Sequence, residues 1–197
     1  MNSTNDGAGD ADVLAALRRA TASRHEVLDS GLALSGEAPT LGDYASHLLL
    51  LRNWLIPLQA WLACFADAPV GLPPAGRLAL IDADLQEPSL AGIVALPLPA
   101  VADTAWPLDA SAAYRWGVCY VIEGSQLGGA VLYQRLHQSL APHPLRYLRG
   151  APDGPGPRWR EFMLALRANV RGDAAIAEAC AGACAAFDAI LAHAFPH

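Results

Sequence analysis

Apolar residues recur at helical spacing along most of this chain, and this pattern restricts its fold more than any other feature. Residues 11–30 place Leu14, Leu17, Thr21 and Leu28 in one stripe, as on the buried face of an α-helix. No segment shows the strong period-2 alternation that is typical of a half-buried β-strand. The sequence therefore predicts an all-α protein.

Segments rich in proline and glycine divide this pattern into five or six substantial helices. Thr40 and Asp43 have the spacing of a capping box, which predicts that a second helix begins there, kinks at Pro57 and ends near residue 65. Asp109 is expected to cap a long helix over residues 110–140. The other expected helices cover residues 78–85, 158–171 and an Ala-rich segment that ends near 194. Prolines break the pattern over 141–157, and the rest of 67–110 predicts a long ordered loop.

The chain length and composition fit a single domain. Of the 197 residues, 53% are hydrophobic, which is enough to form a sizeable core. Residues 1–10 are polar and lack the basic start and apolar centre of a signal peptide, so we expect a disordered tail followed by one helical domain over 11–197. No apolar run reaches the length of a membrane span, because residues such as Arg52 and Asp67 interrupt the most apolar stretch. These features predict a cytoplasmic protein that does not enter a membrane.

The net charge and the type of basic residue limit the kinds of molecule that the protein is expected to bind. The net charge is −6, and all thirteen basic residues are arginine. This balance argues against a nucleic-acid-binding module, which usually presents a net basic face. Thirteen guanidinium groups are nevertheless enough to line a local pocket for a small anionic molecule.

Three glycines interrupt an otherwise good helix in the segment Tyr120–Gly129. A glycine inside a helix costs about 0.5–1 kcal/mol relative to alanine, so the three together need a compensating role. Gly124 and Gly128 are one turn apart and share a face, and Gly129 lies beside them. This bare face is suited either to close packing of another helix or to a planar cofactor that lies against the backbone.

His25 is the second candidate for chemistry. At 100° per residue it falls with the apolar stripe of the first helix, where a histidine is either a core residue or a ligand. Asp29, one turn later, is placed to accept a hydrogen bond from Nδ1, which would fix the tautomer and raise the basicity of Nε2. Arg18, two turns earlier, is placed to meet an anionic edge of anything bound at His25.

The two segments together resemble the haem oxygenase family. The stretch LRRATASRHEVLD around His25 is similar to the first helix of that family, which carries its proximal histidine. The stretch YVIEGSQLGG is similar to the glycine-rich distal helix, in the form found in bacterial members associated with bacteriophytochromes. The helix with Tyr44 and Pro57 and the helix with Trp159 also fit, so the resemblance covers nearly the whole chain and implies a single-domain haem oxygenase-like fold.

This resemblance implies specific roles for the candidate residues. His25 would be the iron ligand through Nε2, and the backbone at Gly124, Gly128 and Gly129 would press on the distal face of the haem. The residues implied to contact the haem propionates are Arg18, Tyr120, Arg158 and Arg160, with Arg167 as a weaker candidate.

One position departs from the mammalian members of the family. They carry an aspartate just after the first distal glycine, and it holds the water network that supplies protons. This chain has Ser125 there, as bacterial members do. Glu123, before the glycine, would either organise water in its place or simply be solvated. The residue that delivers protons is therefore not assigned by the sequence.

The resemblance implies an enzyme that consumes its own cofactor. Haem b would be cleaved with O₂ to biliverdin, CO and iron. No dinucleotide fingerprint is present, so electrons would come from an external ferredoxin or reductase, and a bacteriophytochrome is an implied recipient of biliverdin. The alternatives are a non-catalytic haem-binding or haem-trafficking protein on the same fold, which Ser125 keeps open, and a helical domain that binds no haem.

Overall fold

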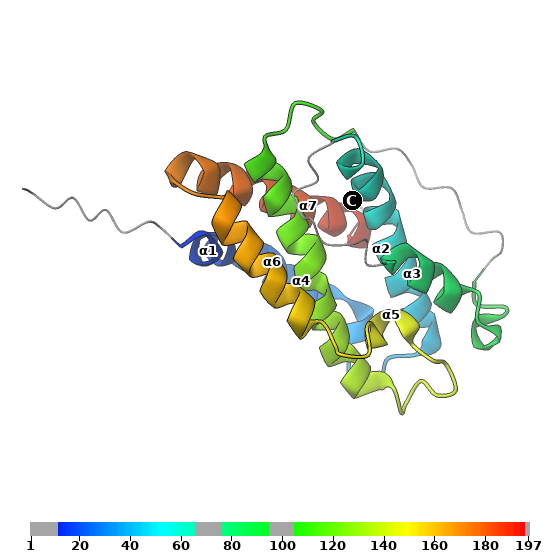
Figure 1. Ribbon diagram of the computed structural model, residues 1–197. Coiled ribbons are helices and arrows are strands. Elements are labelled where there is room, and N and C mark those ends of the chain that lie inside the picture. Colours follow the sequence, from blue (N-terminus) through cyan, green and yellow to red (C-terminus); the bar gives the residue numbers. More distant parts are fainter. Residues whose placement is uncertain (1–11, 66–75, 95–104, 196–197) are drawn as a thin grey trace, which may run out of the picture.

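The computed structural model describes residues 12–65, 76–94 and 105–195, so the expected tail at 1–10 and part of the expected loop at 67–110 lie outside it (Figure 1). These residues form helices and no β-strand, which confirms the all-α prediction. In chain order the elements are α1 (Val13–Gly31), η1 (Ala33–Ser35), α2 (Leu41–Leu62), α3 (Arg77–Leu85), η2 (Pro88–Leu90), α4 (Ala112–Leu136), α5 (Arg146–Arg149), α6 (Gly156–Asn169) and α7 (Asp173–Ala194).

Side-chain caps determine where the long helices begin. The predicted capping box of α2 is present, since Thr40 Oγ1 accepts from the backbone N–H of Asp43 at 3.2 Å and the Asp43 carboxylate accepts from the Thr40 N–H at 2.8 Å. Helix α2 continues through Pro57. The cap of α4 is Ser111, whose Oγ accepts from the Tyr114 N–H at 3.1 Å, so the assignment of this cap to Asp109 was wrong.

The proline-rich stretch 141–157 contains the short helix α5, which the sequence did not predict. His143 is buried there, and its Nε2 lies 3.1 Å from the backbone oxygen of Asp84 in α3. The buried Asp84 carboxylate accepts from the Tyr44 hydroxyl at 2.7 Å and from the Tyr147 backbone N–H at 2.8 Å. Because a buried carboxylate must be hydrogen-bonded to offset its lost hydration, these bonds hold α2, α3 and α5 together.

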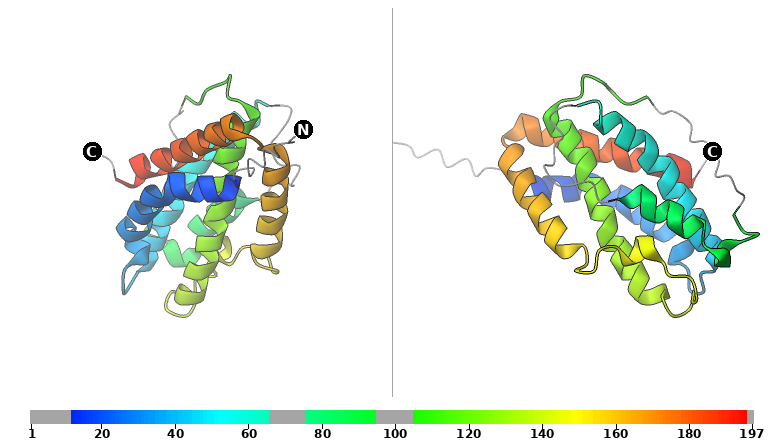
Figure 2. Two further views of the ribbon diagram at one scale, coloured as in Figure 1. Left: turned by 90° about the vertical axis from the view of Figure 1, so that its left-hand side faces the viewer. Right: turned by 45° about the vertical axis from the view of Figure 1, so that its right-hand side comes forward.

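Helices α4 and α7 form the most extensive contact in the molecule, and α1 lies beside α7 (Figures 1 and 2). Two glycines allow this close approach. A Cβ atom added at Gly117 would lie 1.8 Å from the backbone oxygen of Ala179, and one added at Gly182 would lie 2.0 Å from the backbone oxygen of Tyr114. The crossing of the two helices therefore depends on Gly117 and Gly182, which are outside the glycine cluster that the sequence analysis singled out.

By length and composition alone, helix α7 could cross a membrane. This corrects the expectation that no apolar segment reaches that length. In the structure its buried residues, among them Ile176, Ala179, Ala183 and Phe187, belong to the hydrophobic core. Packing of this face against α4 and α1 accounts for its apolar composition.

Candidate functional site

His25 lies on α1 with its side chain 61% exposed, so the expectation that it points with the core was wrong. Its Nδ1 atom lies 2.9 Å from Oδ2 of Asp29, as the i,i+4 spacing predicts. Its ring is 5.8 Å from the ring of Phe187 on α7. The Asp29 carboxylate thus holds one ring nitrogen, and Nε2 makes no hydrogen bond with the described part of the chain, which leaves it available to a ligand.

The three candidate glycines of α4 are not required by close packing of the described residues. A Cβ at Gly124 would lie 3.7 Å from Trp159, and one at Gly129 would lie 3.8 Å from Leu148, both ordinary van der Waals distances. A Cβ at Gly128 would meet no described atom within 4 Å. Helix packing therefore does not account for this bare face, and the open space at Gly128 fits a flat ligand against the backbone.

Two contacts join α4 to the N-terminal part of the chain, one to α1 and one to η1. At one side Arg18 interacts with the hydroxyl of Tyr120; burial raises the pKa of Tyr120, and Arg18 opposes that rise. At the other side Arg135 on α4 donates to the backbone oxygens of Leu34 and Ser35 in η1. The interval between these contacts contains His25 on α1 and the glycines on α4.

His25 and Gly128 lie at similar distances along their own helices from the contact between Arg18 and Tyr120. His25 is seven residues beyond Arg18 and Gly128 is eight beyond Tyr120, so each is about 10–12 Å along its helix from the shared contact. Gly128 is exposed, and Val131, on the same face of α4, is 70% exposed. We use the name α1–α4 opening for the exposed parts of α1 and α4 within this interval, which carry His25 on α1 and Gly128 and Val131 on α4. Figure 2 shows the two helices crossing at an angle, with α7 beside α1.

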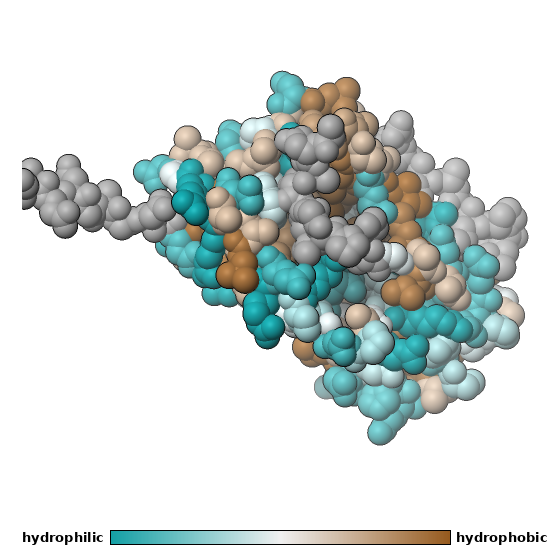
Figure 3. Space-filling model, viewed as in Figure 1, coloured by the Kyte–Doolittle hydropathy of each residue, from teal (hydrophilic) through white to brown (hydrophobic). Residues whose placement is uncertain are grey.

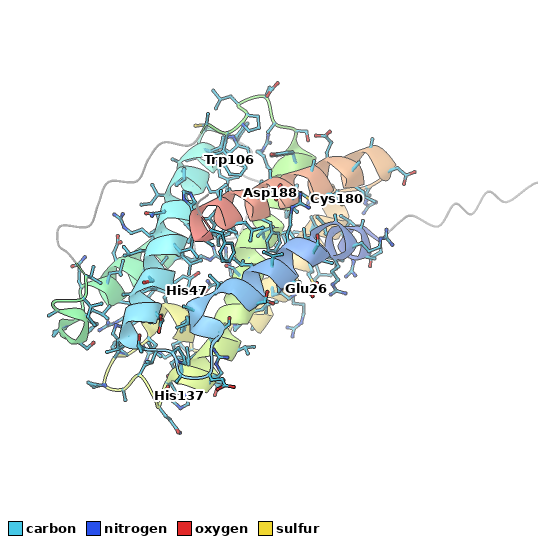
Figure 4. The ribbon with its side chains drawn as sticks, turned by 180° about the vertical axis from the view of Figure 1, so that it is seen from behind. Glu26, His47, Trp106, His137, Cys180 and Asp188 are labelled. Atoms are coloured by element: carbon cyan, nitrogen blue, oxygen red, sulfur yellow. The ribbon has the colours of Figure 1, made fainter. Side chains whose placement is uncertain are left out.

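Seen from the opposite side of the molecule, α1 and α7 cover the centre of the structure (Figure 4). Asp188, labelled there on α7, accepts two hydrogen bonds from Arg24 of α1 at 2.6 and 3.0 Å. Together with the contacts of Phe187, this pair fixes α1 against α7 near His25. Helix α1, which carries His25, is thus anchored to the core through α7 as well as through its contact with α4.

Glu123 is neither solvated nor free to organise water, which corrects both expectations for this residue. It is 7% exposed and accepts from Arg77 at 2.7 Å and from Arg158 at 2.7 and 2.8 Å. Burial alone would raise the pKa of Glu123, but Arg158 and Arg77 outweigh it and lower the pKa below its ordinary value. Arg77 was not among the residues expected from the sequence, because its partner lies 46 residues away along the chain.

These ion pairs affect which of the predicted arginines can bind a carboxylate at the edge of a ligand. Arg158 is held on Glu123 by two bonds, so its predicted contact with a propionate competes with this ion pair. Arg160 is exposed on α6, and Arg167 lies 3.3 Å from Asp12. Arg18 and Tyr120 are together where α1 and α4 meet, which is the placement that their predicted roles require.

Ser125 donates from its hydroxyl to the backbone oxygen of Ile122 at 2.8 Å, within its own helix. Its neighbour Gln126 donates to the hydroxyl of Tyr147 at 2.9 Å. Ser125 is therefore held by α4 and also interacts with Tyr147, and the next residue ties α4 to α5 as well.

The buried triad of Glu123, Arg77 and Arg158 predicts a measurable loss of stability in Glu123→Gln. The amide keeps the volume but removes the charge between two guanidinium groups, so we expect the free energy of unfolding to fall by about 2 kcal/mol. Because the pKa of Glu123 is lowered on folding, its stabilisation is present at neutral pH and is lost as the pH falls through that lowered value. Urea unfolding at pH 7 and pH 3 measures both effects.

The matched control for that substitution is Asp188→Asn, which removes the exposed partner of Arg24. Exposed pairs contribute about 0–1 kcal/mol, so this change is expected to have a much smaller effect. Equal losses in the two variants at pH 7 would contradict the buried ion triad.

Comparisons with known proteins identify the family of this chain. No family model matches the chain. A curated protein named heme oxygenase, from Xanthomonas campestris pv. campestris (strain 8004), is 35% identical over 143 residues, which cover 72% of this chain and 79% of that protein. The solved structure of the NO- and CO-bound heme oxygenase from Neisseria meningitidis superposes with a TM-score of 0.68 at 25% identity, covering 93% of this chain and 90% of that one. This chain therefore belongs to the haem oxygenase family of oxidoreductases.

Proposed function

We propose that this protein cleaves haem b, using O₂ and electrons from an external donor, to biliverdin, CO and iron. Its membership of the haem oxygenase family makes it an enzyme that degrades haem. The observation that best supports the proposed site is the pairing of an exposed imidazole, held at Nδ1 by Asp29, with an empty backbone face at Gly128. The haem would lie between them, in the α1–α4 opening.

Each residue of the opening would have a definite task. His25 Nε2 would bind the iron, and Asp29 would keep the proton on Nδ1 and so keep Nε2 basic. The helix backbone at Gly124, Gly128 and Gly129 would form the wall of the O₂ side, where a side chain at Gly128 would fill the open space. Arg18, Tyr120 and Arg160 would hold the propionates, with Arg158 available only at the expense of its bond to Glu123. Bound haem itself supplies the redox chemistry.

The donor set fits a ligand of this kind. A neutral imidazole is the usual axial ligand of haem iron, and a cationic and phenolic edge suits the carboxylates at the rim of a porphyrin. A wall of backbone and glycine brings no acidic side chain close to the iron. Any proton would therefore have to arrive through water held by the helix backbone or by Ser125. A ferredoxin or reductase as donor, a cytoplasmic site of action and transfer of biliverdin to a bacteriophytochrome are part of the proposal.

Reconstitution tests the proposed activity. The purified protein is mixed with haem b, its Soret and visible bands are recorded, and ascorbate or a ferredoxin system is added in air. Replacement of the haem spectrum by that of biliverdin, with release of CO, is the expected result. A stable haem complex that never turns over would instead support haem trafficking, and the absence of binding would support a helical domain without haem.

Gly128→Leu tests the distal wall. No described atom lies within 4 Å of a Cβ at this position, so the fold should be retained, and a gain in helix propensity of about 0.8–1 kcal/mol should raise stability. The added side chain would occupy the opening, so we expect the rate of biliverdin formation to fall by about 10–100-fold, as misplacement of reacting groups does in other enzymes. Single-turnover spectroscopy and CO titration of the ferrous complex measure this effect.

The matched control is Gln134→Leu, which places the same side chain at an exposed position of α4 about 120° around the helix from Gly128. It is expected to leave turnover and CO affinity unchanged. Full activity in Gly128→Leu would exclude the proposed position of the haem.

A further inference from the structure

A second cavity, of about 200 Å³, lies on the other side of α4 from the α1–α4 opening. Gln126 and Ala130 line it, and at 100° per residue they point away from Gly128. The other walls come from the start of α3, from α5 and the loop after it, and from the start of α6. The lower half of the face seen in Figure 3, over α5 and the second half of α4, is mainly hydrophilic. The proposed haem site shares with this cavity its wall, α4, and one propionate candidate, Arg158.

The charged residues that line this cavity are three arginines and one carboxylate. They are Arg77, Arg149, Arg158 and Glu123. Glu123 is already shared by Arg77 and Arg158, so the cavity keeps a net charge of two positive units. This local charge is opposite in sign to that of the whole chain, which is −6. A concentration of positive charge around a cavity, with one of its arginines buried, favours an anionic ligand.

Arg77 is only partly satisfied by its protein neighbours. It is 5% exposed, and it donates one hydrogen bond, from Nη2 to Glu123. Its Nε–H is buried and has no hydrogen-bond partner among the described residues. An unpaired buried donor costs about 1–3 kcal/mol, so a group that satisfies the rest of this guanidinium would stabilise the structure. Arg149 is exposed at the rim of the cavity, and no described carboxylate lies within ion-pair distance of it.

The N-terminus of α6 is a third feature that favours an anion, besides the net positive charge and the incompletely bonded Arg77. Gly154 and Pro155 line the cavity, and Pro155 caps the helix without a side-chain hydrogen bond. Within the first turn, the backbone N–H groups of Gly156 and Arg158 have no carbonyl partner inside the helix. The positive end of the helix dipole is therefore uncapped next to the arginines, a combination that binds oxyanions in many proteins.

We propose that this cavity binds a small oxyanion of charge near −2, for which inorganic phosphate is the simplest representative. A doubly charged anion balances the two net positive charges, whereas a single carboxylate leaves one of them uncompensated. The volume is below the roughly 300–1,000 Å³ of sites for drug-sized ligands, which favours an isolated anion over a larger molecule. The site needs no haem, so the proposal stands independently of the proposed function.

Titration of the intact haem-free protein with inorganic phosphate tests the site. Calorimetry in low-salt buffer at pH 8 should show one site with a dissociation constant of about 1 mM or tighter. Amide NMR shifts should move at Gly150, Gly154 and Gly156. Sulfate should bind similarly and acetate at least about tenfold more weakly, because one charge-assisted bond and one unit of charge are lost. No binding up to about 20 mM, equal binding of acetate, or shifts confined to other regions would overturn the proposal.

Substitution of the rim arginine tests the assignment. Arg149→Gln, at an exposed position, should fold normally and weaken phosphate binding about tenfold. Arg171→Gln, which removes the same charge from an exposed arginine outside the cavity, should leave it unchanged. Arg77→Lys should also weaken binding, because lysine keeps the charge but lacks the Nε–H. Equal affinities in Arg149→Gln and Arg171→Gln would show that phosphate binds through general charge alone, against the proposal.

Discussion

Replacement of His25 by alanine is expected to abolish haem degradation while leaving the fold of the haem-free protein intact. The side chain is 61% exposed, and its contacts are with Asp29 and the ring of Phe187, so its removal leaves no cavity in the core. Loss of a group that merely supports a metal ligand costs about 10–100-fold in affinity or activity, and loss of the ligand itself should exceed 100-fold. Circular dichroism, haem titration and biliverdin production measure the three quantities.

Rescue by added imidazole separates ligation from other roles of this residue. A small imidazole that enters the space left by the side chain should restore the spectrum of a nitrogen-ligated haem complex in His25→Ala. Asp29→Asn should give an intermediate loss, because the ligand remains but its Nδ1–H no longer meets a charge. His137→Ala, at a partly exposed histidine at the end of α4, is the matched control and should behave as the parent. Unchanged turnover in His25→Ala would refute the ligand assignment.

Gly117→Ala is expected to cause the largest loss of stability of the substitutions considered. The added Cβ would lie 1.8 Å from the Ala179 oxygen and 2.9 Å from the Ala183 nitrogen, and neither backbone atom can rotate away as a flexible side chain would. Helices α4 and α7 would have to separate along their main contact, so we expect a loss of about 3 kcal/mol or more. For a chain of this length that corresponds to a melting temperature lower by roughly 6–12 °C.

Gly128→Ala is the control for that experiment, since it makes the same change on the same helix. With no described atom within 4 Å of the new Cβ, it should stabilise the haem-free protein by about 0.5–1 kcal/mol. Thermal and urea unfolding of the two variants under identical conditions gives the comparison. Similar stabilities in Gly117→Ala and Gly128→Ala would contradict the close contact between α4 and α7.

The helices and their periodicity were predictable because they depend on local sequence. The capping box at Thr40 and Asp43 is confirmed by its hydrogen bonds. The exposure of His25 was not predicted, although helix geometry allows it. At 100° per residue His25 lies about 80° from the buried Leu17, at the edge of the apolar stripe, where a small difference in packing decides whether a side chain is buried.

Features that depend on distant residues were not predictable from a single sequence. Glu123 is buried because Arg77 and Arg158 come to it from α3 and α6, and His143 is buried because Asp84 lies opposite it. The glycine cluster suggested close packing or a ligand, and no described residue packs closely at Gly128. The close helix contact uses Gly117 instead, which stands alone in its segment and faces the Ala-rich α7. Runs of small residues around Gly182 were the available signal for it.

The contacts of Arg18 with Tyr120 and of Arg135 with η1 have a consequence for ligand binding at the proposed haem site. Both contacts are present in the haem-free protein, so they would hold α4 at a fixed separation from α1 and η1 before a ligand binds. In the proposed site, a planar ring would then bind without any need for the two helices to be reordered, which would lower the entropic cost of binding.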